Sequence, residues 1–249
     1  MRTPVMAGNW KMYKTPAETT AFFARFLPLV AATSGREIVI AAPYIDLPAA
    51  VEATRGSSVK VAAQDVFWEK EGAFTGQISA GMLTAVGAQW TLIGHSERRQ
   101  YCGETDETVY KRTIAALDAG LKPIVCVGEL LDDREAGCTN DVLHAQFTGG
   151  LGPLTAEQFA AVVVAYEPVW AIGTGKTATP QIAADAHRCI RELVTAKFGK
   201  AAGESLRILY GGSVKPENAK ELMSQEQIDG VLVGGASLKP EGFAAIVNY

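Results

Sequence analysis

The sequence predicts an α/β protein folded as a single-domain (β/α)₈ barrel, and three observations support this prediction. Short apolar runs alternate with helical segments eight times along the chain, which is typical of parallel strands joined by crossover helices. The chain has 249 residues, a usual size for such a barrel. No linker, low-complexity stretch or change in composition divides it, so we expect one domain over residues 1–249.

The expected strands are the apolar runs themselves, because a parallel strand is covered on both faces and has little need of polar residues. They lie near residues 5–9, 37–42, 59–64, 90–93, 121–127, 160–166, 206–210 and 229–233. In a closed barrel the carboxyl ends of all strands lie on one face, and active sites are found there. Polar residues at the ends of these runs are therefore the first candidates for chemistry.

Helix starts are marked between the strands. Thr15 to Glu18 reads as a capping box, with Pro16 at the first helical position. Four further helices are expected after Asp46, after Thr105, at Pro180 and at Pro216. Asp46 is expected to cap its helix through its side chain.

A glutamate stands where the sixth apolar run ends and a glycine-rich segment begins. Glu167 follows the run at residues 160–165, where burial of a carboxylate is costly and needs a reason. An ion pair with Lys or Arg is the structural explanation, and a catalytic base is the functional one. The next segment, from Pro168 to Ala178, places Ile172 among permissive glycines. This pattern is typical of a lid with two short hinges.

Polar residues also end two other predicted strands. His95 follows the run at residues 90–93 and precedes a predicted helix. A helix N-terminus disfavours the charged imidazolium, so this histidine is expected to be neutral and to donate a hydrogen bond to an oxygen. A structural role is the more common one for a lone histidine. Asn9 and Lys11 end the first strand, so three strand ends carry candidate groups on one face of the barrel.

Two glycine pairs follow the last two strands. One lies in Tyr210 to Ser213 and the other in Gly234 to Leu238, where barrels commonly hold phosphate with backbone N–H groups. Either pair alone could be a tight turn. No Gly-x-x-x-x-Gly-Lys motif is present, which argues against a nucleotide-binding loop.

Composition excludes several classes of function. The net charge is −4 and the basic residues are scattered, so no nucleic-acid surface is expected. The three histidines and four cysteines form no Cys-x-x-Cys pair or metal cluster, and reduced thiols are typical of the cytoplasm. No apolar run approaches the ~18 residues of a membrane span, and no secretion signal precedes the first strand. We expect a soluble cytoplasmic protein without membrane contact.

Six segments together resemble the triosephosphate isomerase family, whose fold is the TIM barrel. They are Asn9 to Lys11, Gly72 to Gly76, Gly94 to Arg99, the segment around Glu167, Tyr210 to Ser213 and Gly234 to Leu238. The resemblance implies an isomerase of glycolysis and gluconeogenesis that uses no cofactor and no metal. Its reaction would interconvert dihydroxyacetone phosphate and D-glyceraldehyde 3-phosphate through an enediolate.

The resemblance also implies a role for each candidate residue. Glu167 would be the base, neutral His95 the electrophile, and Lys11 the group that stabilises negative charge. Backbone N–H groups of Gly173, Ser213, Gly234 and Gly235 would bind the phosphate when the lid closes. In supporting roles, Asn9 would add a polar contact, Glu97 would order the surroundings of Lys11, and Ser96 would hold the base away while the lid is open.

A homodimer is implied as well. Residues 72–79 correspond to a loop that inserts into the other subunit in this family, with Thr75 and Gly76 near its tip. Phe74 at the tip is suited to a pocket, although a surface excursion is the alternative. Gln77 stands where an acidic residue is commoner, and Asp65 replaces a frequent Asn. These two departures put particular interface contacts in doubt, but leave the catalytic set unchanged.

Two other functions are compatible with the same barrel. A Schiff-base aldolase would use Lys11 as its nucleophile, and trapping of a Lys11 adduct with borohydride would reveal it. A catalytically silent scaffold would be expected to have lost Glu167, His95 or Lys11, and all three are present.

Overall fold

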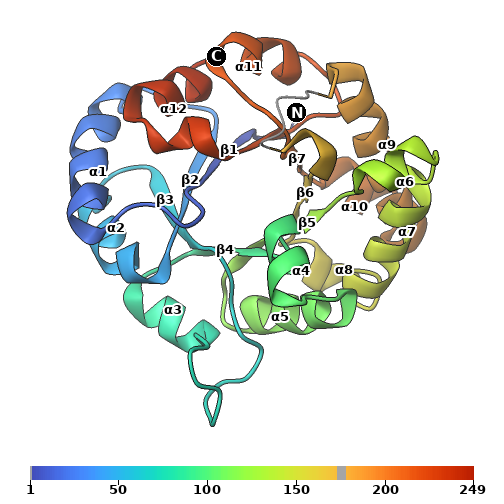
Figure 1. Cartoon of the computed structure of the whole chain (residues 1–249), viewed down its shortest axis with the longest axis horizontal. Coiled ribbons are helices and arrows are strands. Elements are labelled where there is room, and N and C mark those ends of the chain that lie inside the picture. The colour runs from blue at the N-terminus through green and yellow to red at the C-terminus, as the bar shows by residue number, and fades with distance from the viewer. Residues whose placement is uncertain (1, 173–177) are drawn as a thin grey trace.

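Eight parallel strands close into a barrel at the centre of the molecule (Figure 1). The computed structural model describes residues 2–172 and 178–249. The strands follow chain order around the barrel, and the last pairs with the first, with Val5 opposite Gly230. Helices surround the barrel on the outside (Figure 1). The predicted (β/α)₈ fold is confirmed.

The observed strands agree closely with the apolar runs. They are β1 (Val5–Asn9), β2 (Glu37–Ala42), β3 (Val59–Ala63), β4 (Trp90–Ile93), β5 (Lys122–Val127), β6 (Val163–Tyr166), β7 (Ile208–Tyr210) and β8 (Gly230–Val233). The largest difference is at β6, which starts three positions after the predicted residue 160. Ala160 instead ends a short helix, α8 (Ala156–Phe159). A run of apolar residues cannot by itself distinguish a buried turn from the strand that follows it.

The five helices predicted near Thr15, Asp46, Thr105, Pro180 and Pro216 begin at those positions, although the predicted cap at Asp46 does not form. The α-helices besides α8 are α1 (Pro16–Val30), α2 (Leu47–Ala53), α3 (Ala80–Val86), α4 (Ser96–Cys102), α5 (Asp106–Asp118), α6 (Leu131–Glu135), α7 (Thr139–Gly150), α9 (Pro180–Phe198), α10 (Lys200–Ser205), α11 (Pro216–Met223) and α12 (Pro240–Val247). Three 3-10 helices are η1 (Tyr44–Asp46), η2 (Val169–Ala171) and η3 (Gly235–Leu238). The Thr15 capping box is confirmed, because Thr15 and Glu18 each accept the other's backbone N–H. Among the described helices, none is both long and apolar enough to cross a membrane.

The exception is Asp46, for which side-chain capping was predicted wrongly. Asp46 ends η1 and has helical dihedrals, φ −96° and ψ −14°. A capping side chain needs extended backbone to reach the N–H groups of the next turn. Asp46 is instead fully buried, and neither carboxylate oxygen has a hydrogen-bond partner among the described residues. Burial and the nearby Glu18 raise the pKa of this carboxyl group.

The barrel interior is built from alternate residues of the strands. Val5 and Ala7 of β1 and Val163 and Ala165 of β6 belong to a buried cluster separate from the larger layer that includes many helix residues. Side chains alternate in direction along a strand. The next positions in these two series are Asn9 and residue 167, so the strand geometry directs both side chains into the open carboxyl end of the barrel.

Candidate active site

A cavity of about 370 Å³ lies at the carboxyl ends of the strands. Residues from five strand ends line it, including Asn9, Lys11, His95, Glu167, Ser213, Gly234 and Gly235. The structure therefore brings together the candidate residues that the sequence places after β1, β4, β6, β7 and β8. Gly173 lies outside the described residues, as do the other residues of the predicted lid from 174 to 177.

Glu167 is buried beside two hydrogen-bond donors. Its carboxylate is 2.9 Å from the backbone N–H of Ser96 and 2.9 Å from Nε2 of His95. Burial raises the pKa of Glu167, but His95 and the Ser96 N–H favour the carboxylate more strongly, so the net shift is downward. Among the described residues Glu167 forms no ion pair with Lys or Arg, which removes the main structural explanation for its position. The contact with Ser96 that the resemblance implied is present.

His95 immediately precedes α4, and both nitrogens of its ring have a polar neighbour. Nδ1 accepts a hydrogen bond from the Glu97 backbone N–H at 3.2 Å, while Nε2 faces Glu167. Burial lowers the pKa of His95, but the Glu167 carboxylate outweighs it and raises the pKa overall. The helix argument had predicted a downward shift, and it did not foresee a carboxylate at this distance. Because Nδ1 accepts the Glu97 N–H, Nε2 is the ring nitrogen that can donate a hydrogen bond to Glu167.

Lys11 adopts an uncommon backbone conformation next to the cavity. Its φ is +52°, in the left-handed region that residues other than glycine seldom occupy. The side-chain oxygen of Asn9 accepts the Lys11 N–H at 2.9 Å, closing a local turn. The ammonium group pairs with the carboxylate of Glu97, which is the contact that the resemblance implied. Lys11 thus presents its ammonium group to the cavity from a constrained turn.

Close packing around Glu167 explains two glycines. A Cβ at Gly211, just after β7, would lie 2.9 Å from Cγ of Glu167. A Cβ at Gly128, just after β5, would lie 1.7 Å from the Glu167 backbone oxygen. Both distances are shorter than carbon and oxygen atoms tolerate. The absence of a side chain at these two positions therefore allows Glu167 to occupy its position.

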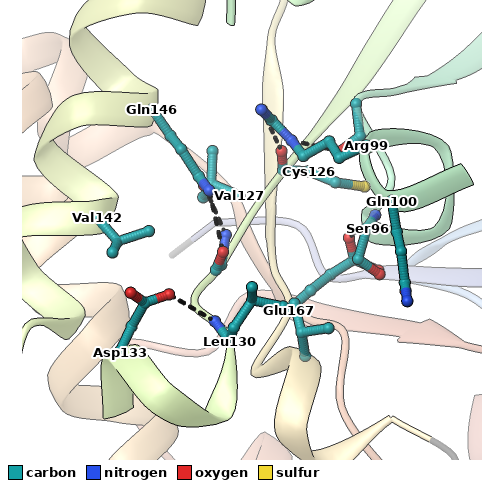
Figure 2. A pocket seen from close by; sticks show the side chains of 13 residues that line it. Ser96, Arg99, Gln100, Cys126, Val127, Leu130, Asp133, Val142, Gln146 and Glu167 are labelled. Atoms are coloured by element: carbon teal, nitrogen blue, oxygen red, sulfur yellow. Dashed lines mark hydrogen bonds between the residues drawn. The ribbon is translucent and has the colours of Figure 1, made fainter. Parts of the chain in front are cut away.

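A second cavity of about 330 Å³ is lined by Ser96 and by Glu167, which also lines the first cavity. Figure 2 shows the Glu167 side chain directed toward Ser96, with Cys126 nearby. Cys126 is fully buried, and burial together with the Glu167 carboxylate raises the pKa of its thiol. Gln146 of α7 bonds both backbone groups of Gly128, at 2.8 and 3.0 Å. These contacts fix the wall behind the carboxylate.

The described part of the predicted lid is anchored on a buried glutamate. Glu129, after β5, is fully buried and accepts hydrogen bonds from Tyr166 Oη at 3.0 Å and from Trp170 Nε1 at 2.8 Å. Trp170 lies in η2, just after Pro168. Sequence reasoning missed Glu129 and Gln146, and also Gln64, whose amide nitrogen lies 2.8 Å from the Lys11 carbonyl oxygen. None of the three belongs to a local motif. Their partners are distant in sequence, so a pattern search gives no signal for them.

The loop between β3 and α3 projects away from the barrel (Figure 1). Thr75, Gly76 and Gln77 are exposed there, and Phe74 is 41% exposed while its ring packs on Phe67 at 4.9 Å. Large apolar side chains are also exposed elsewhere on the described surface, among them Met12, Ile45, Met82 and Tyr101.

Asp65 is buried at the start of this loop. Its carboxylate pairs with Arg98 at 2.7 Å and Arg112 at 3.1 Å, and Arg112 also donates to the Val66 carbonyl at 2.6 Å. Burial raises the pKa of Asp65 to about 6, although both arginines oppose the shift. Where a frequent Asn would be neutral, this chain thus holds the loop with a buried ionisable cluster.

Comparison with known proteins agrees with this geometry. A family model described as triosephosphate isomerase matches residues 4–249. The chain belongs to the triosephosphate isomerase family. It is 67% identical to the triosephosphate isomerase of Solibacter usitatus, with both chains covered completely. Those of Citrifermentans bemidjiense and Geobacter metallireducens are 57% and 54% identical, with 100% of this chain and 99% of each relative covered.

Family membership identifies the chain as an isomerase, and the family reaction interconverts the two triose phosphates. The predicted resemblance and the predicted enzyme class are confirmed. These comparisons give no support to the aldolase or to the inactive scaffold as alternatives.

Proposed function

We propose that this member of the triosephosphate isomerase family interconverts dihydroxyacetone phosphate and D-glyceraldehyde 3-phosphate with Glu167 as its base. The observation that carries the proposal is a buried carboxylate 2.9 Å from Nε2 of His95, in a cavity that also contains Lys11. The cavity volume of about 370 Å³ suits a small substrate. A glutamate base with a neutral histidine is the arrangement established for triosephosphate isomerase in general, and we extend it to this chain.

The reaction is a pair of proton transfers. Glu167 takes a proton from the carbon next to the carbonyl of the substrate, and the carbonyl oxygen becomes the oxygen of an enediolate. His95 donates from Nε2 to the substrate oxygens and moves a proton between them, while the Lys11 ammonium stabilises the negative charge. Glu167 then returns its proton to the neighbouring carbon. The proton that is removed is replaced at the neighbouring carbon and the substrate gains or loses no electrons overall, so the proposed reaction needs no redox cofactor and no metal.

The substrate itself would keep His95 neutral. The carboxylate of Glu167 raises the pKa of His95 while the two side chains are in contact. A substrate oxygen at Nε2 would replace that carboxylate, and burial, which lowers the pKa, would then dominate. A neutral imidazole matches the weak acidity of the enediol better than an imidazolium does.

Phosphate binding is assigned to the residues that line the cavity after β7 and β8. Ser213 follows β7, and Gly234 and Gly235 lie at the start of η3. We assign their backbone N–H groups to the phosphate, together with that of Gly173 in the lid. Closure of the lid would exclude water and protect the enediolate from loss of phosphate.

We also propose a cytoplasmic homodimer of single-domain subunits, acting in glycolysis and gluconeogenesis. The projecting loop with exposed Thr75 and Gly76 supports the dimer, as do the exposed side chains of Met12 and Tyr101, at 94% and 75%. Apolar surface of this kind is typical of interfaces. Met12 is adjacent to Lys11, so the partner's loop would support the turn that carries the ammonium group.

A coupled assay for isomerisation of glyceraldehyde 3-phosphate tests the function. The wild-type chain is expected to be active without added metal or cofactor. Glu167→Gln, which keeps the shape of the side chain but removes the base, is expected to lose nearly all of kcat. Full activity of this variant would exclude Glu167 as the base.

A further inference from the structure

Gln64 lies just after β3 and holds the turn that carries Lys11. Its side-chain amide nitrogen is 2.8 Å from the backbone oxygen of Lys11 and 3.1 Å from that of Ala41. The side-chain oxygen of Asn9 lies 3.4 Å from the same nitrogen. All three neighbours are oxygen atoms that accept hydrogen bonds. One amide group therefore connects the ends of β1, β2 and β3.

The Lys11 turn needs such support because its backbone is strained. A residue other than glycine is strained in the left-handed region, where its Cβ approaches the following carbonyl oxygen, and Lys11 has φ +52°. Asn9 restrains the N–H side of this residue and Gln64 restrains its carbonyl side. Among the described residues, no other side chain donates to the Lys11 carbonyl. Without Gln64, the peptide after Lys11 would be free to rotate and to carry the side chain with it.

We propose that Gln64 is a positioning residue that fixes the Lys11 ammonium group over the substrate site. Gln64 does not line the cavity that holds Asn9, Lys11, His95 and Glu167, so it acts through Lys11 and has no contact with substrate. The inference rests on the proposed function, in which Lys11 binds the negative charge of substrate and enediolate. It adds a residue that no local motif of the sequence marks.

The surroundings of Gln64 provide an isosteric test. Gln64→Glu keeps the size and shape of the side chain, but it replaces the donor nitrogen with an oxygen. That oxygen would then face three acceptor oxygens. Gln158→Glu is the matched control, with the same change in atoms and charge. At Gln158 the side-chain oxygen makes the hydrogen bond, because it accepts the Thr155 backbone N–H at 2.9 Å. A carboxylate oxygen would preserve that bond. Gln64→Met removes the donor without adding charge.

The experiment measures kcat, KM and the calorimetric affinity for 2-phosphoglycolate, an anion with a phosphate and a carboxylate. Displacement of a catalytic group by about 1 Å can cost on the order of 100-fold, so Gln64→Glu is expected to lower kcat/KM by 10- to 100-fold. Gln64→Met should show a smaller loss in the same direction, and Gln158→Glu should match wild type. Thermal unfolding and sedimentation confirm that each variant is folded and assembled.

A double-mutant cycle with Lys11→Ala decides the mechanism. If Gln64 acts through the Lys11 side chain, Gln64→Glu weakens 2-phosphoglycolate binding in the wild-type background and has little further effect beside Lys11→Ala. An equal loss in both backgrounds, or no loss in either, would overturn the inference. Failure of the underlying function gives a different result, because Lys11→Ala alone would then leave kcat and affinity unchanged.

Discussion

A single methyl group at Gly211 is predicted to displace the base without removing it. In Gly211→Ala the new Cβ would lie 2.9 Å from Cγ of Glu167 and 3.1 Å from the backbone oxygen of Tyr166. Non-bonded carbon atoms prefer separations of about 3.5–4.0 Å, so Cγ must retreat by roughly 0.6–1 Å. The backbone accepts alanine here, because Gly211 is not among the glycines with positive φ.

The retreat moves the carboxylate away from the position that His95 and Ser96 define at 2.9 Å. A displacement of this size is expected to reduce kcat by about 10- to 100-fold. KM should change little, because the phosphate contacts are assigned to other residues. The coupled isomerase assay, run under saturating triose phosphate, measures the loss directly.

Gly81→Ala is the matched control. Gly81 lies in α3, does not line the cavity that holds Glu167, and has no positive φ. A Cβ there would meet only Oγ of Ser79, at 3.9 Å, which is ordinary van der Waals contact. Its kcat is expected to stay within a few-fold of wild type. If Gly211→Ala and Gly81→Ala show the same kcat, then contact with Glu167 does not set the rate, and the packing explanation fails.

Three further predictions concern assembly, stability and the lid. Replacing Thr75 with Arg and Gly76 with Glu buries two charges in the proposed interface at a cost of several kcal/mol if they stay unpaired; we expect a monomer with strongly reduced kcat, and a fully active monomer in sedimentation velocity would contradict this. Burial lowers the pKa of His187 from 6.5 to about 3, so its contribution to stability is complete above pH 6.5 and is lost as the pH falls, by about 1.4 kcal/mol per unit; urea unfolding of His187→Asn should show a shallower loss from pH 6.5 to 5 than wild type, and parallel curves would disprove the assignment. Deleting residues 172–175 should leave a folded enzyme that releases methylglyoxal, because an open site no longer retains the enediolate; unchanged turnover without methylglyoxal would show that this segment is not a lid.

The fold and the positions of the main site residues could be predicted because both depend on local patterns. Apolar runs mark buried parallel strands, and polar residues at their ends mark the barrel mouth, so Glu167 and His95 were placed correctly relative to the strands. Other features depend on contacts between segments distant in sequence. The upward pKa shift of His95 requires a carboxylate 72 positions away in the chain, the difference between 167 and 95. Gln64 contacts residues at the ends of two other strands, and no periodic pattern in the sequence indicates these contacts.

The capping role of Asp46 was predicted wrongly for a different reason. Its residue type and its place before Leu47 satisfy the N-cap pattern, but the preceding 3-10 turn fixes its backbone in a helical conformation. Residue type alone cannot predict that conformation, because it arises from packing of η1.

The most direct test of the central claim is to run the isomerisation in D₂O and to measure deuterium at the carbons next to the carbonyl group. If Glu167 removes a proton through an enediolate and exchanges it with solvent before returning one, product formed in D₂O will contain carbon-bound deuterium. Glu167→Gln should form almost no product and incorporate almost no deuterium into substrate. Turnover and deuterium incorporation at wild-type rates in Glu167→Gln would contradict the account, because protons would then be exchanged at carbon without this carboxylate.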